Sequence, residues 1–270
     1  MSTGSVSTGP VSTGTDSAGS RVPAGRATGP VRVVLVHGAW HRGSCWAPLV
    51  EALGARGYPA LAPDLPSDLP GRGAEAYADA VVEAVGPGTE PVLLVGHSLG
   101  GLTVPLVAER LGPERVVGLV LLAAMTPVPG TSFIGRMRTD SLMVEGYDAG
   151  VRRGEDGTTY WPADAAPDGL YRGVAQESSP ESVADAVAAM RPQAWTVGKE
   201  TTPLAVWPPT RTVAVVCAQD RVASPQACRR AAEAIGAEIV ELDGGHFPML
   251  TRPEELADVL AGLAVTGRAG

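Results

Sequence analysis

Short apolar runs alternate with helical patterns from residue 31 to near the end of the chain. The apolar runs are rich in Val and Leu and occupy 31–36, 58–62, 91–95, 116–123, 212–217 and 238–242. Continuous runs of this kind are typical of fully buried strands. The segments between them that have helical spacing are 45–56, 75–85, 99–111, 225–235 and 253–263. The pattern therefore predicts about six strands in alternation with helices.

This alternation predicts a mostly parallel sheet with helices on both of its faces. Right-handed crossovers between parallel strands then give an α/β fold, a three-layer α/β sandwich. In open sheets of this type, functional residues lie on loops at the carboxyl ends of the strands. The position of each candidate residue relative to a strand end is therefore a test of its role.

The stretch 125–209 interrupts this rhythm. A structureless loop of that length is unusual in a compact domain. We interpret it as a helical cap inserted after the fourth strand, with its clearest helix at 180–190, so that the core comprises 30–124 and 210–270. Some of the cap's aromatic residues are expected to line a pocket, and the others to pack the cap onto the core: Phe133, Tyr147, Tyr160, Trp161, Tyr171, Trp195 and Trp207.

Residues 1–29 form a segment of low complexity, in which Val-Ser-Thr-Gly occurs at 6–9 and again at 11–14. A segment of this composition buries too little apolar surface to offset the entropy lost on ordering. The sequence therefore predicts a disordered tail.

Charge and cysteine content narrow the possible partners and location. The formal net charge of −8 argues against nucleic acid and anionic membranes as partners. No apolar run is long enough to span a membrane, and the N-terminus lacks the pattern of a signal peptide. The odd number of cysteines (Cys45, Cys217 and Cys228) favours reduced packing residues over disulfides. We expect a cytoplasmic protein; its oligomeric state is not indicated.

The sequence Gly-His-Ser-Leu-Gly at 96–100 follows the third predicted strand and opens the next helix. This is the strand–turn–helix setting of a nucleophile elbow. The nucleophile of such a turn has a strained backbone, and the glycines two residues away leave room for it. The pattern predicts Ser98 as a nucleophile; the alternative is a glycine-rich turn that only packs a helix on a strand.

A serine nucleophile needs a histidine base and an acid to orient it. The chain has four histidines. His37 and His41 lie in the turn after the first predicted strand and His97 directly precedes Ser98, which leaves His246 as the candidate base. It follows the sixth predicted strand. Asp220 follows the fifth and gives the chain order Ser, acid, His. Asp243 is the competing acid, although its place three residues before His246 favours a role in the turn that presents the histidine.

The turn at 37–40 follows the first strand and supplies the second half of an oxyanion hole. The N–H groups of Ala39 and Leu99 are predicted to converge on the developing oxyanion. Gly38 leaves space beside the nucleophile, and His37 is expected to hold the turn by hydrogen bonds. No spacing of Cys, His, Asp or Glu predicts a metal site, and no glycine-rich motif predicts a nucleotide cofactor.

These motifs resemble a known family. The segments 36–41, 45–46, 96–101, 122–124 and 216–220 resemble the plant methylesterase and hydroxynitrile lyase family, and the wider α/β-hydrolase resemblance covers 31–264. It implies the triad Ser98, Asp220 and His246. Lyases of the family carry threonine where this chain has Gly38 and lysine where it has Phe247. The resemblance therefore favours the hydrolase branch.

The expected function is hydrolysis of a small to medium apolar carboxylic ester, lactone or thioester, without a cofactor. Two alternatives stay open: a lyase or other cofactor-free reaction on the same scaffold, and a slow-turnover ligand-binding receptor. The residues expected to line the substrate pocket come from the oxyanion turn, the cap and the histidine loop: Gly38, Trp40, Phe133, Trp161, Trp195 and Phe247.

Overall fold

The computed structural model describes residues 1, 30–174 and 177–266. The predicted disorder of the N-terminal tail thus concerns residues that lie, except for Met1, outside the described part of the chain.

Six parallel strands form the main sheet, as the alternating pattern predicts. Their order is β2-β1-β3-β4-β7-β8, and every neighbouring pair is parallel. The strands are β1 (Arg32–Val36), β2 (Ala60–Leu61), β3 (Val92–His97), β4 (Val116–Leu122), β7 (Thr212–Cys217) and β8 (Glu238–Leu242). The chain crosses from the β2 edge to β3 on the other side of β1, so β1 and β3 flank a topological switch point, the usual place for a site in such sheets.

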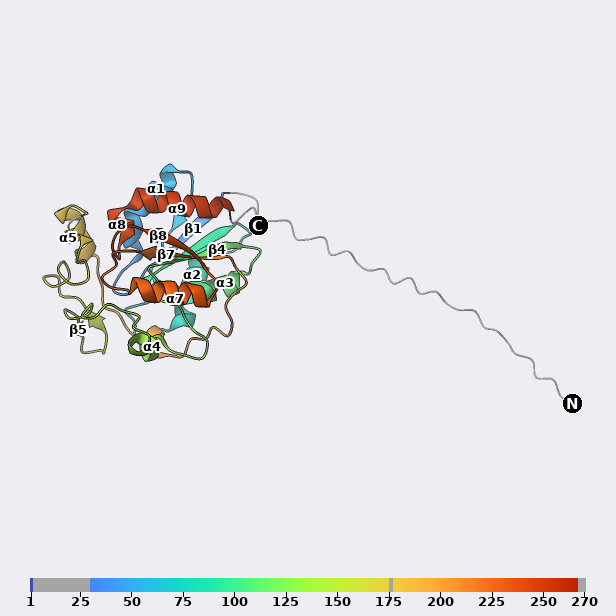
Figure 1. Cartoon of the computed structure of the whole chain (residues 1–270), viewed down its shortest axis with the longest axis horizontal. Helices are drawn as coiled ribbons and strands as arrows, with labels where there is room; N and C mark the ends of the chain where they lie inside the picture. The colour runs from blue at the N-terminus through green and yellow to red at the C-terminus, as the bar shows by residue number, and fades with distance from the viewer. Residues whose placement is uncertain (2–29, 175–176, 267–270) are drawn as a thin grey trace.

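Helices cover both faces of this sheet. Figure 1 shows α1 (Ala47–Ala55) and α9 (Pro253–Thr266) on one side of the sheet, and α2 (Ala74–Val85), α3 (Val104–Leu111) and α7 (Pro225–Ala234) on the other. The predicted helices at 45–56 and 99–111 each begin with a 3₁₀ segment, η1 (Gly43–Trp46) and η2 (Ser98–Leu102). Pro48 and Pro105 then lie in the first turn of α1 and α3, where the missing N–H has no helical partner to lose.

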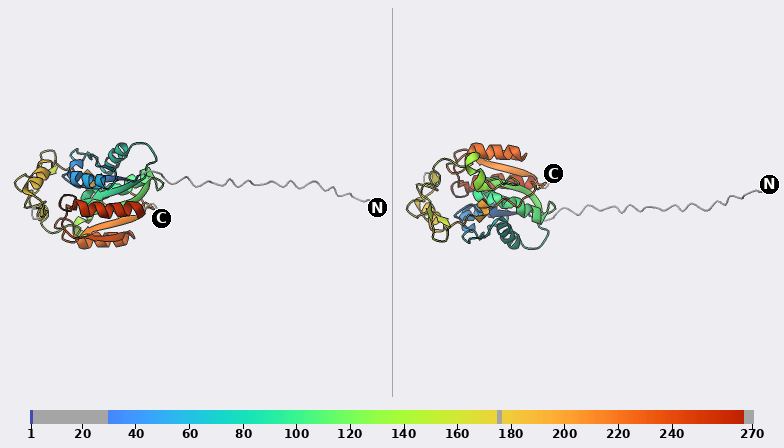
Figure 2. Two further views of the ribbon diagram at one scale, coloured as in Figure 1. Left: turned by 90° about the horizontal axis from the view of Figure 1, so that it is seen from above. Right: turned by 90° about the horizontal axis from the view of Figure 1, so that it is seen from below.

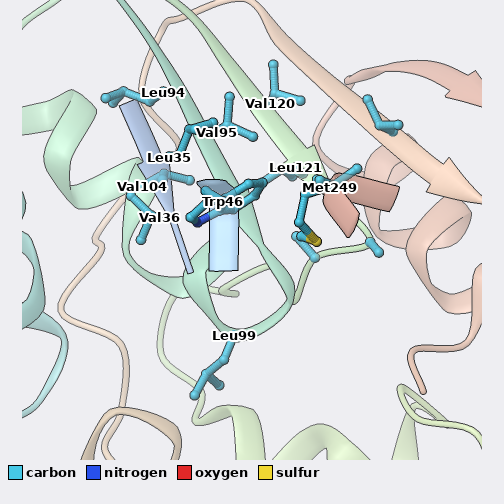
Figure 3. Packing of buried hydrophobic residues seen from close by; sticks show 14 of the residues in the cluster. Leu35, Val36, Trp46, Leu94, Val95, Leu99, Val104, Val120, Leu121 and Met249 are labelled. Carbon is cyan, nitrogen blue, oxygen red and sulfur yellow. The ribbon is translucent and has the colours of Figure 1, made fainter. Parts of the chain in front are cut away.

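The core consists mainly of aliphatic side chains between the sheet and its helices. The residues of β3 are all buried, as are those of β1 after Arg32. Figure 3 shows Leu35, Val95 and Leu121 gathered around Trp46, which is fully buried, with Met249 beside it. Leu99 lies apart from this group, beyond the strand ends. Burial on this scale is the main stabilising contribution to the fold, and it fixes where the strand-end loops lie.

The connection from β4 to β7 contains several short elements instead of one helical unit. They are α4 (Phe133–Thr139), β5 (Arg152–Arg153), β6 (Thr159–Tyr160), α5 (Pro180–Ala188) and α6 (Thr196–Lys199). The antiparallel pair β5–β6 was not predicted, because strands of two residues carry no periodicity. Figure 2 shows the part of this connection around α5, drawn in yellow, beyond one end of the sheet. The division into core and cap stays a prediction.

A further short helix, α8 (Pro248–Thr251), follows the loop that carries His246. Within residues 30–174 and 177–266, no helix has the length and apolar character needed to cross a membrane.

Candidate active site

Ser98 lies on the sharp turn between β3 and η2, and its φ of 50° is in the left-handed region. Such a conformation is strained for a residue with a side chain. The surrounding glycines explain how it is accommodated: a Cβ on Gly96 would lie 2.9 Å from the carbonyl oxygen of Gly100, and one on Gly100 would lie 2.5 Å from that of Val36. The turn is therefore a nucleophile elbow in its geometry as well as its sequence.

Asp220 and His246 are joined by a buried hydrogen bond. His246 Nδ1 lies 2.7 Å from Asp220 Oδ2, and both side chains are almost completely inaccessible. A carboxylate oxygen accepts, so Nδ1 carries the proton and Nε2 keeps its lone pair. Asp220 Oδ1 accepts from the N–H groups of Val222 and Ala223, at 2.7 and 2.9 Å. Because both carboxylate oxygens are used, the acid is held in one orientation.

The competing acid, Asp243, lies in a different environment. It is exposed, and its Oδ1 accepts a hydrogen bond of 2.7 Å from the side-chain amide of Gln219. The hydrogen bond to the His246 ring comes from Asp220.

Ser98 and His246 line one cavity, together with the oxyanion turn. Among the hydrogen bonds between described residues, none joins the two side chains. Catalytic hydrogen bonds in unliganded sites are often long and shorten when the substrate binds. The N–H of Leu99 is among the first of η2, a position that has no partner within the helix. Ala39 lines the same cavity from the loop after β1, whose carboxyl end lies beside that of β3.

His37 holds the oxyanion turn as a neutral ring. Its Nε2 accepts from the N–H of Leu65 at 3.0 Å, so the proton is on Nδ1, which donates to the carbonyl of Gly38 at 2.9 Å. Burial lowers the pKa of His37 to about 3. His41 extends this support: Nδ1 donates to the carbonyl of Ala39 at 2.6 Å, and the Tyr171 hydroxyl donates to Nε2 at 2.7 Å.

His97 contacts the catalytic histidine through its own ring. Its Nε2–H donates to the carbonyl of His246 at 2.8 Å, and the ring centroids are 4.7 Å apart. Burial, followed by the charges of His246 and His41, lowers the pKa of His97 well below 6.5. Phe247 packs edge-on against the His246 ring with a centroid separation of 5.0 Å. These two rings restrict the movement of the His246 loop.

The cavity is lined mainly by apolar side chains. Five of the residues predicted for the substrate pocket lie in its wall: Gly38, Trp40, Phe133, Trp195 and Phe247. Trp161, also predicted, is not part of this wall; it packs edge-on behind Trp40 with a centroid distance of 6.2 Å. The wall also contains residues that the sequence did not single out for the pocket: Met125, Met143, Tyr147, Leu170 and Val222.

Trp40 and Trp195 share one hydrogen-bond acceptor. Both indole N–H groups donate to the hydroxyl oxygen of Thr159, at 3.0 and 2.7 Å, and the two rings meet edge to face at 5.5 Å. Trp40 has a φ of 62°, a strained backbone conformation that the surrounding contacts maintain. The β4–β7 connection thus fixes one wall of the cavity.

Arg191 is a positioning residue that the sequence did not reveal. Its backbone N–H donates to the carbonyl of Trp40 at 3.0 Å, and its Nε donates to the carbonyl of His41 at 3.1 Å. The guanidinium also donates to the carbonyl of Leu65 and lies 3.5 Å from the carboxylate of Asp68. The side chain is buried. Arg191 therefore ties the oxyanion turn to the β4–β7 connection from 150 residues away; an isolated arginine carries no sequence signal for such a role.

The arrangement of potential metal ligands and the state of the three thiols bear on metal binding and on thiol reactivity. Within residues 30–174 and 177–266, no group of His, Cys, Asp and Glu is arranged to hold a metal ion. Cys45, Cys217 and Cys228 are free thiols. Burial raises the pKa of the Cys228 thiol to about 12 and raises the pKa of the other two as well. Thiols in this state are protonated at neutral pH and react slowly.

Comparison with known proteins identifies the family of the chain. Residues 33–259 match the alpha/beta hydrolase family. "Esterase PIR7B" of Oryza sativa subsp. japonica is 30% identical over 257 residues, which cover 86% of this chain and 94% of that protein. "Methylesterase 2" of Arabidopsis thaliana is 33% identical over 133 residues, 42% of this chain and 48% of that protein.

Two pyrethroid hydrolases are also similar. That of Sphingobium wenxiniae is 37% identical over 105 residues, so the match spans only 36% of this chain and 37% of that protein. The crystal structure of a pyrethroid hydrolase from Sphingobium faniae superposes with a TM-score of 0.72 at 23% identity, and covers 88% of this chain and 98% of its own. The structural match supports the fold. The chain belongs to the alpha/beta hydrolase family, and within it to the carboxylic ester hydrolases.

Proposed function

We propose that the chain is a serine hydrolase that cleaves a small to medium apolar carboxylic ester, lactone or thioester through an acyl-enzyme on Ser98. The observation that carries this proposal is the buried hydrogen bond from His246 to Asp220, on loops that border the same cavity as the strained turn of Ser98. It leaves Nε2 of His246 free to accept a proton.

The reaction proceeds in two halves. His246 takes the proton of the Ser98 hydroxyl as the oxygen attacks the carbonyl carbon, and the N–H groups of Ala39 and Leu99 stabilise the oxyanion. His246 then protonates the leaving alcohol as its bond to carbon breaks. In the second half His246 deprotonates a water molecule, which attacks the acyl group, and the proton returns to Ser98 as the acid departs. The sum is ester plus water giving acid plus alcohol.

The cavity wall supports hydrolysis over cyanohydrin cleavage. Among the described residues that line it, none is lysine or arginine. A departing cyanide would therefore meet no cationic side chain, and Phe247 instead fills the space next to His246. The mainly apolar wall supports an uncharged, apolar group next to the scissile bond. The three free thiols support our further proposal that the protein works in the cytoplasm.

Steady-state turnover tests this function. We expect the wild-type protein to hydrolyse 4-nitrophenyl esters of short acids, and Ser98→Ala to lower kcat by at least about 10³-fold. Tight ligand binding without turnover by the wild-type protein would support a receptor instead, and release of cyanide from cyanohydrins would support a lyase. Equal turnover by Ser98→Ala and wild type would refute the proposal.

A further inference from the structure

A second hollow lies beside the catalytic cavity, within the β4–β7 connection. Its volume is about 460 Å³, compared with about 20 Å³ for the catalytic cavity. Trp40, Tyr147 and Trp195 line both of them. The smaller space holds little more than one water molecule. An ester of ordinary size bound at Ser98 must therefore displace these aromatic side chains or extend past them into the second hollow.

Three cationic side chains line this second hollow: Arg138, Arg153 and Lys199. They come from α4, β5 and α6, so the fold brings them together from segments that are separate in sequence. All three are exposed, and none forms an ion pair within the described part of the chain. The hollow has one carboxylate in its lining, that of Asp148. We call this site the basic hollow.

The positive charge of the basic hollow contrasts with the chain as a whole, whose formal net charge is −8. Two other cations of the β4–β7 connection are already paired: Arg136 lies 2.7 Å from Asp140, and Arg191 lies 3.5 Å from Asp68. Unpaired cations around a depression attract anions, and Arg binds a carboxylate or phosphate through two parallel hydrogen bonds. A purely apolar ligand would gain nothing from this arrangement.

We propose that the basic hollow binds an anionic group of the substrate, a carboxylate or phosphate carried at the end remote from the scissile carbonyl. The inference rests on the proposed function and narrows its substrate class. The acyl part of the substrate extends from Ser98 past Trp40, Tyr147 and Trp195, which line both spaces, and places its charge among the three cations.

Matched pairs of substrates test this proposal. Each pair consists of the mono-4-nitrophenyl ester of a diacid, from glutarate to sebacate, and the 4-nitrophenyl ester of the straight-chain acid of equal carbon number. We expect the triple variant Arg138→Gln, Arg153→Gln, Lys199→Gln to hydrolyse at least one diacid ester with a kcat/KM about tenfold lower than that of the wild-type protein. Each exposed cation is expected to contribute a factor of roughly three or less to this loss. The neutral partner should change less than about twofold, and added salt should reduce the difference.

Arg152 provides the matched control. It lies next to Arg153 on β5 and is also exposed, but it is not part of the lining of the basic hollow. We expect Arg152→Gln to leave the kcat/KM of both esters unchanged. A triple variant that lowers both esters equally, or neither, would overturn the inference while leaving ester hydrolysis intact. A wild-type protein inactive on both esters of every pair would overturn the proposed function and this inference together.

The same assay distinguishes a site for phosphate from a site for a carboxylate. If inorganic phosphate competes with the diacid esters in the wild-type protein but not in the triple variant, while acetate does not compete, the site selects phosphate over carboxylate. Competition by both ions shows a site for either anion. Absence of competition by either ion, together with an unchanged charge preference in the triple variant, would refute the assignment.

Discussion

The carboxylate of Asp220 accepts three hydrogen bonds, two from backbone N–H groups and one from His246. The position of Asp220 could be predicted for two reasons. It follows a strand, which places its side chain at the edge of the sheet that carries the candidate site, and it lies between Ser98 and His246 in the chain. Ser98 and His246 were predictable for the first of these reasons. The lining of the cavity was not, because Trp161 and Trp195 look alike in sequence while only Trp195 reaches the wall.

The roles of the two candidate acids can be separated by mutation. We expect Asp220→Asn to lower kcat by up to about 10⁴-fold, because an amide in this place does not favour the His246 tautomer that accepts the serine proton. Asp243→Asn removes the same charge from an exposed residue that contacts Gln219, and should lower kcat less than about threefold. Comparing kcat for the two variants is the measurement; a larger loss for Asp243→Asn would assign the acid to residue 243.

Gly38 is a residue whose side chain must be absent. A Cβ at this position would lie 2.8 Å from the Cβ of Ser98 and 3.2 Å from Nδ1 of His97. We expect Gly38→Ala to displace the nucleophile and lower kcat by about 10- to 100-fold. Gly54→Ala in α1 is the control, since a Cβ there meets nothing within 4 Å. Similar kcat values for Gly38→Ala and wild type would show that the turn has more room than its geometry indicates.

At the scale of elements, long strands and helices follow from periodicity, and the short ones do not. The bounds of β7 and β8 agree with the predicted 212–217 and 238–242 because each is a compact apolar run. The elements α4, α6 and the β5–β6 pair are too short for a pattern, and contacts with the rest of the molecule determine them. For the same reason no sequence motif announces that Arg191, beyond α5, supports the turn after β1.

The contact of Arg191 with the oxyanion turn is testable through kinetics. We expect Arg191→Met to lower kcat by about 10-fold or more, because the carbonyls of His41 and Leu65 lose a donor and the turn relaxes. Arg191→Lys keeps the charge but not the planar fork, and should give an intermediate kcat. Urea unfolding of each variant, alongside kcat and KM, provides the check. A loss of stability with unchanged kcat would limit Arg191 to a structural role.

At the scale of the whole molecule, buried histidines link stability to pH. Burial lowers the pKa of His37 to about 3 and that of His41 to about 4, and it lowers the pKa of His97 as well. Each has a pKa near 6.5 when unfolded, so below that pH the unfolded chain binds more protons than the folded one. Their contribution to stability is therefore complete above pH 6.5 and is lost as the pH falls toward 4.

We expect the free energy of unfolding to be lower by about 2 kcal/mol or more at about pH 5 than at about pH 7.5. The carboxylates with lowered pKa values, such as Glu238 and Asp258, titrate below this window and do not account for the change. Urea unfolding monitored by circular dichroism at the two pH values measures it. His41→Gln should reduce the pH dependence; equal stability of the wild-type protein at both pH values would contradict the buried, neutral state of the rings.

The most direct test is to find where the protein becomes covalently modified. After reaction with a fluorophosphonate, mass spectrometry of proteolytic fragments should locate one adduct on Ser98. His246→Ala should slow its formation, and Ser98→Ala should abolish it. An adduct on another residue, or undiminished modification of Ser98→Ala, would contradict the central claim.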